Sequence, residues 1–312
     1  MDPVVLFFIF GFFAGLVKSD LKLDSSITDL LTVLLLLTIG LKGGIKLHDQ
    51  SFLALWPQIL AVLFLGFIIP IIAYPLLTKV GRMNRVDSAS MAAHYGSVSV
   101  GTFAVCMAFL NHHGISYEPY VSLFVIILEV PAIIIGLIIA KSGKEISSFP
   151  SLLGETLRSK AIVLLMGGLV IGWIAGEQRM EPYTPFFFKL FYGVLALFLM
   201  DMGRVVSEQF RVVKRYGVFI FGFGIIMPFI SGMIAMSLGW LVGLSLGGTV
   251  VLTILGASAS YIAVPAAMRV SLPEANLSLS LGSSLGVTFP FNVMVGIPMF
   301  FYITQSLFSF SG

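Results

Sequence analysis

Charged residues are scarce in this chain. Only 11% of its 312 residues are Asp, Glu, Lys or Arg, whereas a soluble domain has about 25%. So few charges cannot cover a surface that faces water.

The net charge of +3 has no basic tract behind it, which argues against a nucleic-acid partner. The single cysteine, Cys106, excludes an intrachain disulfide. No Lys or Arg precedes Lys18, although a secretory signal begins with a positive region, so residues 3–17 are interpreted as a retained first span.

Apolar residues fill the space that charges leave. They make up 58% of the chain, in long runs that recur from one end to the other, so the lipid bilayer is the expected solvent. We predict an all-α polytopic membrane protein with about ten transmembrane helices. The windows are 3–17, 27–47, 53–78, 88–110, 117–140, 161–176, 186–206, 216–239, 247–270 and 277–307.

The distribution of basic residues predicts the orientation in the membrane. Most of the 18 Lys and Arg lie in loops that follow odd-numbered spans, and only Lys42, Lys46, Arg179 and Lys189 fall elsewhere. Cytoplasmic loops carry the excess of Lys and Arg, so both termini are expected outside a bacterial plasma (inner) membrane.

The chain divides into two halves that resemble each other weakly. We assign residues 1–140 to a first repeat, 141–160 to a cytoplasmic linker and 161–312 to a second repeat. An odd number of spans in each half makes the second copy inverted, here as two five-helix repeats, and inverted repeats are typical of secondary transporters that bind substrate at the midplane. Coincidence in an apolar chain of low complexity is the competing explanation.

Small and hydroxyl-bearing residues interrupt the fourth and ninth spans at corresponding places. The fourth contains "GSVSVGTFAV" (96–105) and the ninth "LGASASYIAVP" (255–265). Interrupted helices in lipid are tolerated where their free backbone groups line a cavity or contact protein, and the exposed helix N-termini attract anions. We predict discontinuous helices that cross at a small-anion site. The candidate substrate-binding residues are Ser97, Ser99, Gly101, Thr102, Ser258, Ser260 and Tyr261. Close helix packing also explains small residues here.

Oxygen-bearing residues near the ends of both halves predict a cation site. The last span contains "LGSSLGVTFPFN" (281–292), and the fifth carries an intramembrane acid beside Pro131. Hydroxyl, amide and carboxylate oxygens suit a hard cation such as Na⁺, and acids within membranes are usually functional. The alternative for this acid is pairing with a backbone group freed by Pro131. The candidate Na⁺ ligands are Glu129, Ser283, Ser284, Thr288 and Asn292.

The remaining polar residues are assigned to structure. Asp201 and Arg204 have the spacing of an ion pair on one helix. Lys42 is expected to extend its ammonium toward an interface, and His94 is interpreted as a hydrogen-bonded packing residue. No nucleophile, acid and base converge, so the chain is predicted not to be an enzyme. No cofactor is expected apart from Na⁺ as coupling ion.

Four stretches resemble the sodium-dependent bicarbonate transporters of the SbtA type. They are "TIGLKGG" (38–44), the region from "VD" (86–87) through "GSVSVGT" (96–102), "ISYE" (115–118) and "EVPA" (129–132), "SASYIAVPAAMR" (258–269), and "LPEANLSLSLGSSLGVTFPFNVMVGIP" (272–298). The resemblance implies two inverted repeats, a mobile core and a gate domain, a homotrimer, and Na⁺-driven bicarbonate uptake by elevator-type alternating access. It places Ser99, Thr102, Ser258 and Ser260 in the site.

The sequence departs from the cyanobacterial members at the second crossing. Those members have Ser-Ser-Ser-Asp where this chain has Ser258, Ala259, Ser260 and Tyr261, and Thr288, Phe289 and Asn292 also differ from their pattern. The linker is shorter than theirs, which leaves a PII-like regulatory partner open.

The function that these features favour is secondary active transport, with bicarbonate, Na⁺ and the lipid bilayer as partners. Proton- or Na⁺-coupled transport of another small anion, such as a monocarboxylate, with Glu129 carrying the proton, is the first alternative. A passive channel or a membrane sensor is the second.

Overall fold

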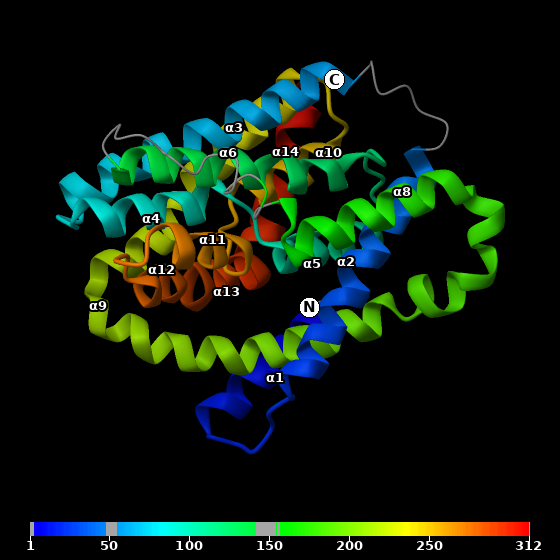
Figure 1. Ribbon diagram of the computed structural model, residues 1–312. Helices are drawn as coiled ribbons and strands as arrows, with labels where there is room; N and C mark the ends of the chain where they lie inside the picture. The colour runs from blue at the N-terminus through cyan, green and yellow to red at the C-terminus, as the bar shows by residue number, and fades with distance from the viewer. Residues whose placement is uncertain (1–2, 48–54, 142–153, 155–156, 312) are drawn as a thin grey trace.

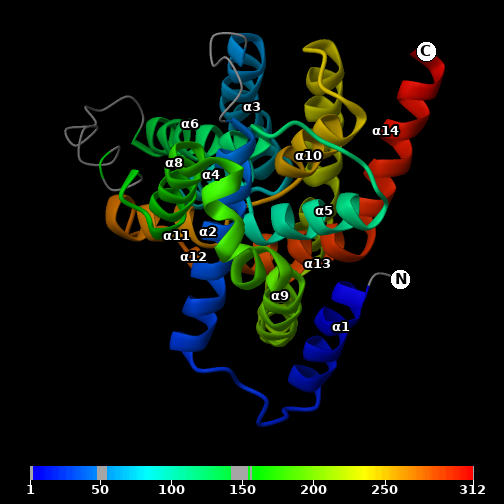
Figure 2. The same cartoon turned by 90° about the vertical axis from the view of Figure 1, so that its right-hand side faces the viewer.

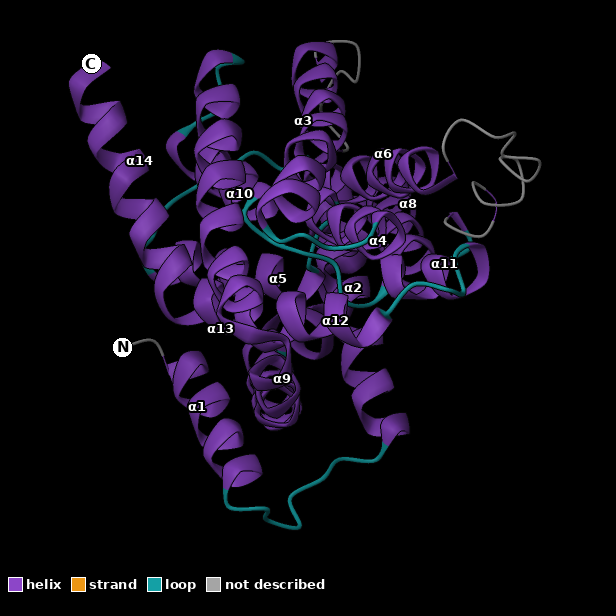
Figure 3. Ribbon diagram, turned by 90° about the vertical axis from the view of Figure 1, so that its left-hand side faces the viewer, coloured by secondary structure: helices purple, strands orange, loops and turns teal. Residues whose placement is uncertain are grey.

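The computed structural model describes residues 3–47, 55–141, 154 and 157–311, and in these residues all regular structure is helical (Figure 3). Of the predicted linker 141–160, residues 142–153 and 155–156 lie outside this range. The α-helices are α1 Pro3–Leu16, α2 Ser25–Leu47, α3 Trp56–Pro75, α4 Arg85–Gly96, α5 Val100–His112, α6 Val121–Lys141, α8 Lys160–Met180, α9 Phe191–Leu241, α10 Leu246–Gly256, α11 Ala263–Ser271, α12 Leu277–Ser283, α13 Phe289–Phe291 and α14 Ile297–Ser311. Short π-helical and 3-10 turns link some of them, namely η2 Leu76–Val80, η3 Glu181–Tyr183, η4 Pro185–Lys189, η5 Ser284–Thr288 and η6 Asn292–Gly296.

Helix covers part of every predicted window, but not every helix is long enough to span a bilayer alone. By length and composition, 7 helices of the described chain qualify. They cover Ser25–Leu47, Trp56–Val80, Arg85–His112, Val121–Lys141, Lys160–Tyr183, Gly217–Leu241 and Leu277–Ser309. α1, with 14 residues, and α10, with 11, are apolar but shorter. The protein is therefore a multi-pass helical membrane protein.

α9 is two helices joined at a glycine. Its 51 residues contain one non-helical position, Gly217, with φ 84° and ψ 179°. Glycine adopts positive φ without the steric cost that a Cβ would impose. Gly217 is the second residue of the predicted window 216–239, so the break separates this window from 186–206. Figure 1 shows the helix running along the lower part of the molecule before it turns.

Glycines allow two helix pairs to approach closely. α2 packs along α8, and α1 along α9 (Figure 2). A Cβ at Gly44 would overlap the Leu169 carbonyl oxygen, and a Cβ at Gly11 would overlap the Met200 carbonyl oxygen. Small residues at such contacts let helix backbones meet in lipid. The glycines of "TIGLKGG" are thus explained by packing.

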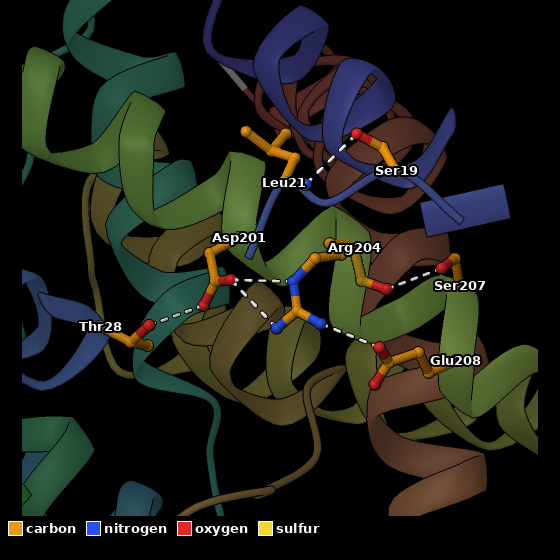
Figure 4. A network of polar contacts seen from close by, with 7 residues as sticks. All are labelled: Ser19, Leu21, Thr28, Asp201, Arg204, Ser207 and Glu208. Carbon is orange, nitrogen blue, oxygen red and sulfur yellow. Dashed lines mark hydrogen bonds and ion pairs between the residues drawn. The ribbon is translucent and has the colours of Figure 1, made fainter. Parts of the chain in front are cut away.

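A network of charged and polar side chains joins α2 to α9 (Figure 4). The Arg204 guanidinium lies 3.2 Å from Asp201 Oδ1 and 2.9 Å from Glu208 Oε1. Thr28 Oγ1 donates to Asp201 Oδ2 over 2.8 Å. The predicted Asp201–Arg204 pair is confirmed, and Thr28 extends it to a second helix.

The centre of the molecule is formed by the interrupted helices. Every residue from Ser88 to Ala108 is buried, as is every residue from Gly247 to Tyr261. α4 packs against α3 and α6, while α10 packs against α9 and α14. The two polar breaks therefore lie inside protein and not against acyl chains.

Candidate functional site

The first break separates α4 from α5. α4 ends at Gly96, and Ser97 and Ser99 have extended backbones. Ser99 is the N-cap of α5: its Oγ accepts from the Thr102 amide at 3.0 Å and from Thr102 Oγ1 at 2.8 Å. Serine is favoured at N-caps because its hydroxyl satisfies an amide that has no partner in the helix. The local sequence "SVSVGT" thus encodes both the interruption and the restart.

The second break separates α10 from α11. α10 ends at Gly256, and α11 begins at Ala263, with Pro265 in its first turn. Proline is tolerated there because it removes no hydrogen bond within the helix. Ser260 Oγ accepts from the Val264 amide at 3.3 Å.

The two breaks cross and are hydrogen-bonded to each other. The Ser99 amide donates to Ser258 Oγ over 2.9 Å, and the Ser260 amide donates to the His94 carbonyl over 2.8 Å. Ser97 and Thr102 are buried in the same region. The structure therefore brings together the predicted substrate-binding serines of both halves.

A very small cavity, of about 10 Å³, lies at this crossing. It is lined by Val98, Ser99, Val100, Glu129, Ala161, Ser260, Tyr261, Ile262 and Ala263. The lining includes the first residues of both α5 and α11, so two helix N-termini with partial positive charge lie beside one space. A volume of this size holds about one water molecule.

Glu129 is the acidic residue of this cavity. It comes from the middle of α6, is 2% exposed, and its Oε2 has no hydrogen-bond partner among the described residues. A buried carboxylate without compensation is costly, but helix N-termini and a bound cation both favour a negative charge. Glu129 was predicted to bind a cation together with residues of the last span, and it lies at the crossing of the two breaks.

Tyr261 also lines the cavity. A Cβ at Gly101 would overlap the Tyr261 hydroxyl, and the Tyr261 ring meets Phe289 edge-on at 5.4 Å. The lack of a side chain at Gly101 therefore leaves room for the Tyr261 hydroxyl.

The last-span residues divide into two groups. Tyr95 OH is hydrogen-bonded to Ser283 Oγ at 2.6 Å and to Thr288 Oγ1 at 2.8 Å, and Thr288 Oγ1 also donates to the Gly224 carbonyl at 2.7 Å. Tyr95 was not identified from the sequence, although it lies directly before the first break. These contacts hold the last span against α4.

Asn292 and Ser284 keep oxygens that are not engaged. Asn292 Nδ2 donates to the Ala257 carbonyl at the end of α10 over 2.7 Å, which leaves Asn292 Oδ1 buried without a partner in the described chain. Ser284 Oγ is in the same state. His94 is buried and hydrogen-bonded within its own helix, since its Nδ1 contacts the Ser90 carbonyl at 2.8 Å, while its Nε2 has no partner among the described residues.

Buried helix breaks that expose backbone dipoles and hydroxyls to a central cavity define a membrane protein with a polar site inside its bundle, the arrangement used for small solutes in transporters. The sequence profile of the Na⁺-dependent bicarbonate transporter superfamily matches residues 3–305, so the chain belongs to this superfamily. It is a member of a transporter family and not an enzyme. No curated protein matches the chain.

Proposed function

We propose that this protein takes up bicarbonate together with Na⁺ by elevator-type alternating access. One observation carries the proposal: the N-termini of α5 and α11 meet at a buried cavity that also contains a carboxyl group, Glu129. Helix N-termini favour a small monovalent anion. Ser99 and Ser260, with the backbone amides beside them, supply hydrogen-bond donors without a buried arginine. Bicarbonate is larger than one water, so its binding has to widen the crossing.

Glu129 gives a physical reason for coupling to Na⁺. An ionised carboxylate in this cavity repels an incoming anion, and a cation bound between them removes the repulsion. Na⁺ prefers oxygen ligands, which the Glu129 carboxylate and nearby carbonyls offer. A lone charge at mid-bilayer costs several kcal/mol, so the site crosses readily when doubly loaded and poorly with one ion alone.

A second group of buried oxygens, in the last span, supports the same coupling. Asn292 is hydrogen-bonded to Ala257 at the α10 carboxyl end, where the helix dipole is negative and favours a cation, and its Oδ1 has no partner in the described residues. Ser284 Oγ is also buried without a partner among the described residues. Ser283 and Thr288 already bond to Tyr95. We therefore rank Glu129, Asn292 and Ser284 above Ser283 and Thr288 as Na⁺ ligands.

Corresponding contacts in the two halves support inverted repeats. The Ser245 hydroxyl, before α10, donates to Glu118 Oε2 at 3.0 Å in the loop before α6. The Asn276 amide, before α12, donates to Asp87 Oδ1 at 2.7 Å in the first turn of α4. Each half thus anchors the interrupted helix of the other.

The proposal includes an elevator movement, which the close packing of α2 along α8 and of α1 along α9 as a separate group of helices supports. We assign α1, α2, α8 and the first part of α9 to a gate and the remaining helices to a mobile core. The proposal includes ten spans in repeats 1–140 and 161–312, a homotrimer, and a bacterial inner membrane with both termini outside. A PII-like regulator of the linker is left to experiment.

Proton-coupled transport of another small anion, such as a monocarboxylate, is the second candidate. It is favoured by the replacement of the family's crossing acid with Tyr261, which leaves Glu129 as the acidic group lining the cavity. In this candidate Glu129 carries a proton in place of Na⁺.

Uptake of labelled bicarbonate into proteoliposomes tests the proposal. We expect accumulation that requires an inward Na⁺ gradient, and loss of uptake in the Ser99→Ala/Ser260→Ala double variant with unchanged chromatographic behaviour. Ser237→Ala is the matched control, because Ser237 is exposed and bonds only within its own helix. Uptake that follows a pH gradient and ignores Na⁺ supports the second candidate. If the bicarbonate concentration inside the vesicles never exceeds the concentration outside, the protein acts as a channel. Absence of any bicarbonate flux indicates a sensor.

A further inference from the structure

A second and much larger cavity lies between α2, α5, α6 and α8, with a volume of about 660 Å³. It is formed near the carboxyl ends of α2, α5 and α8, the amino end of α6 and the loop before it. Its polar lining consists of Lys42, Lys46, Asn111, Tyr117, Ser122, Glu177 and Thr184. We call it the vestibule.

Two lysines give the vestibule its charge. Lys42 is partly buried, with its ammonium 4.6 Å from the centre of the Phe191 ring and 5.6 Å from that of Phe188. The Lys46 ammonium lies 5.8 Å from the Tyr117 ring centre. Cation–π contacts hold these ammonium groups without neutralising them. Within the described part of the chain, neither lysine has a carboxylate at ion-pair distance.

A buried hydroxyl faces the same space. Ser122 is 2% exposed and its Oγ has no hydrogen-bond partner in the described residues, although it lines the vestibule. A buried hydroxyl without a partner is unfavourable. An oxyanion in the vestibule would satisfy it while also meeting the two lysines.

The vestibule is aligned with the crossing site. On α5, Met107 lines the vestibule and Val100 lines the crossing cavity. On α6, Ser122 lines the vestibule and Glu129 lines the crossing cavity. Seven residues of helix span about 10 Å, so the two cavities are separated by the same short distance along both helices. The positive-inside pattern predicts that the vestibule opens to the outside.

We infer that the vestibule is an anion-capture site, in which Lys42 and Lys46 concentrate a small oxyanion, bicarbonate, before it enters the crossing. This inference rests on the proposed function. Clefts lined by one sign of charge raise the local concentration of ligands of opposite charge. Glu177 opposes the lysines in the same lining, so its effect on capture has the opposite sign.

Transport kinetics of charge variants test the inference. For Lys42→Met and Lys46→Met we expect KM for bicarbonate to rise about fivefold, because each variant removes one nearby positive charge, while the maximal rate changes little. Glu177→Gln is expected to lower KM, which misfolding cannot mimic. Lys46→Arg keeps the charge and the KM. Lys79→Met, exposed and outside the vestibule, is the control and should leave KM unchanged.

A labelling experiment separates this inference from the proposed function. In Lys46→Cys, an anionic methanethiosulfonate reagent should modify the thiol faster than a cationic one, and Lys42→Met should reduce that ratio. The wild-type chain is the blank, because Cys106 is buried. If wild-type vesicles take up no bicarbonate yet the ratio depends on Lys42, the proposed function fails and the positive vestibule stands. Normal uptake with unchanged KM in both lysine variants, or a ratio independent of Lys42, overturns the inference.

Discussion

The backbone amide of Ser99 donates a hydrogen bond to the hydroxyl of Ser258 across 2.9 Å. Ser99 lies at the interruption between α4 and α5, and Ser258 at the interruption between α10 and α11. The bond shows that the breaks meet, so their exposed dipoles act on one space.

The contact between Gly101 and Tyr261 makes the crossing sensitive to a single methyl group. A Cβ at Gly101 would overlap the Tyr261 hydroxyl and lie 3.1 Å from the Phe198 ring. We expect Gly101→Ala to reduce uptake strongly and to lower the unfolding temperature, because overpacking a buried site costs about 1–3 kcal/mol. Tyr261→Phe in the same chain should restore part of both, measured by uptake and thermal unfolding in detergent. Full activity of Gly101→Ala alone would show that the tyrosine is elsewhere.

Glu129 is predicted to set the ion dependence of transport. Glu129→Gln keeps the size of the side chain and removes its charge, so the dependence of uptake on Na⁺ should become shallower or vanish. We expect at least a tenfold loss of Na⁺ affinity, equivalent to about 1.4 kcal/mol. Initial uptake rates over a Na⁺ titration provide the measurement, with Glu274→Gln in an exposed loop as the control. An unchanged Na⁺ titration in Glu129→Gln would exclude this carboxyl as a ligand of the coupling ion.

Adjacent glycines in α8 should respond differently to the same substitution. A Cβ at Gly168 would lie 2.7 Å from the Leu37 carbonyl oxygen, whereas nothing lies within 4 Å of a Cβ at Gly167. We expect Gly168→Ala to separate α2 from α8 and lower thermal stability. Gly167→Ala should be neutral or stabilising by up to about 1 kcal/mol, since alanine favours helix over glycine. Equal effects in thermal unfolding would contradict the close α2–α8 packing.

Part of the candidate site could be read from local sequence. Glycine, serine and proline in "GSVSVGT" and "SASYIAVP" predict interruption because each weakens helix or caps it within a few residues. The Asp201–Arg204 ion pair could also be predicted from local sequence, because the two residues lie within one helical turn of each other. Tyr95 was missed because its partners, Ser283 and Thr288, are remote in the chain, and nothing in the residues around Tyr95 indicates that it contacts them.

The sequence by itself determined that the chain resides in lipid, that it is helical, and where two of its helices break, because hydropathy and capping act over short stretches. Only the tertiary structure decided that the breaks cross, that Glu129 lies at the crossing while Ser283 and Thr288 are held by Tyr95, and that Lys42 faces a cavity. These relations depend on how segments far apart in the chain pack against each other. Glycine contacts and buried hydrogen bonds between those segments determine this packing, and no single stretch of sequence encodes it.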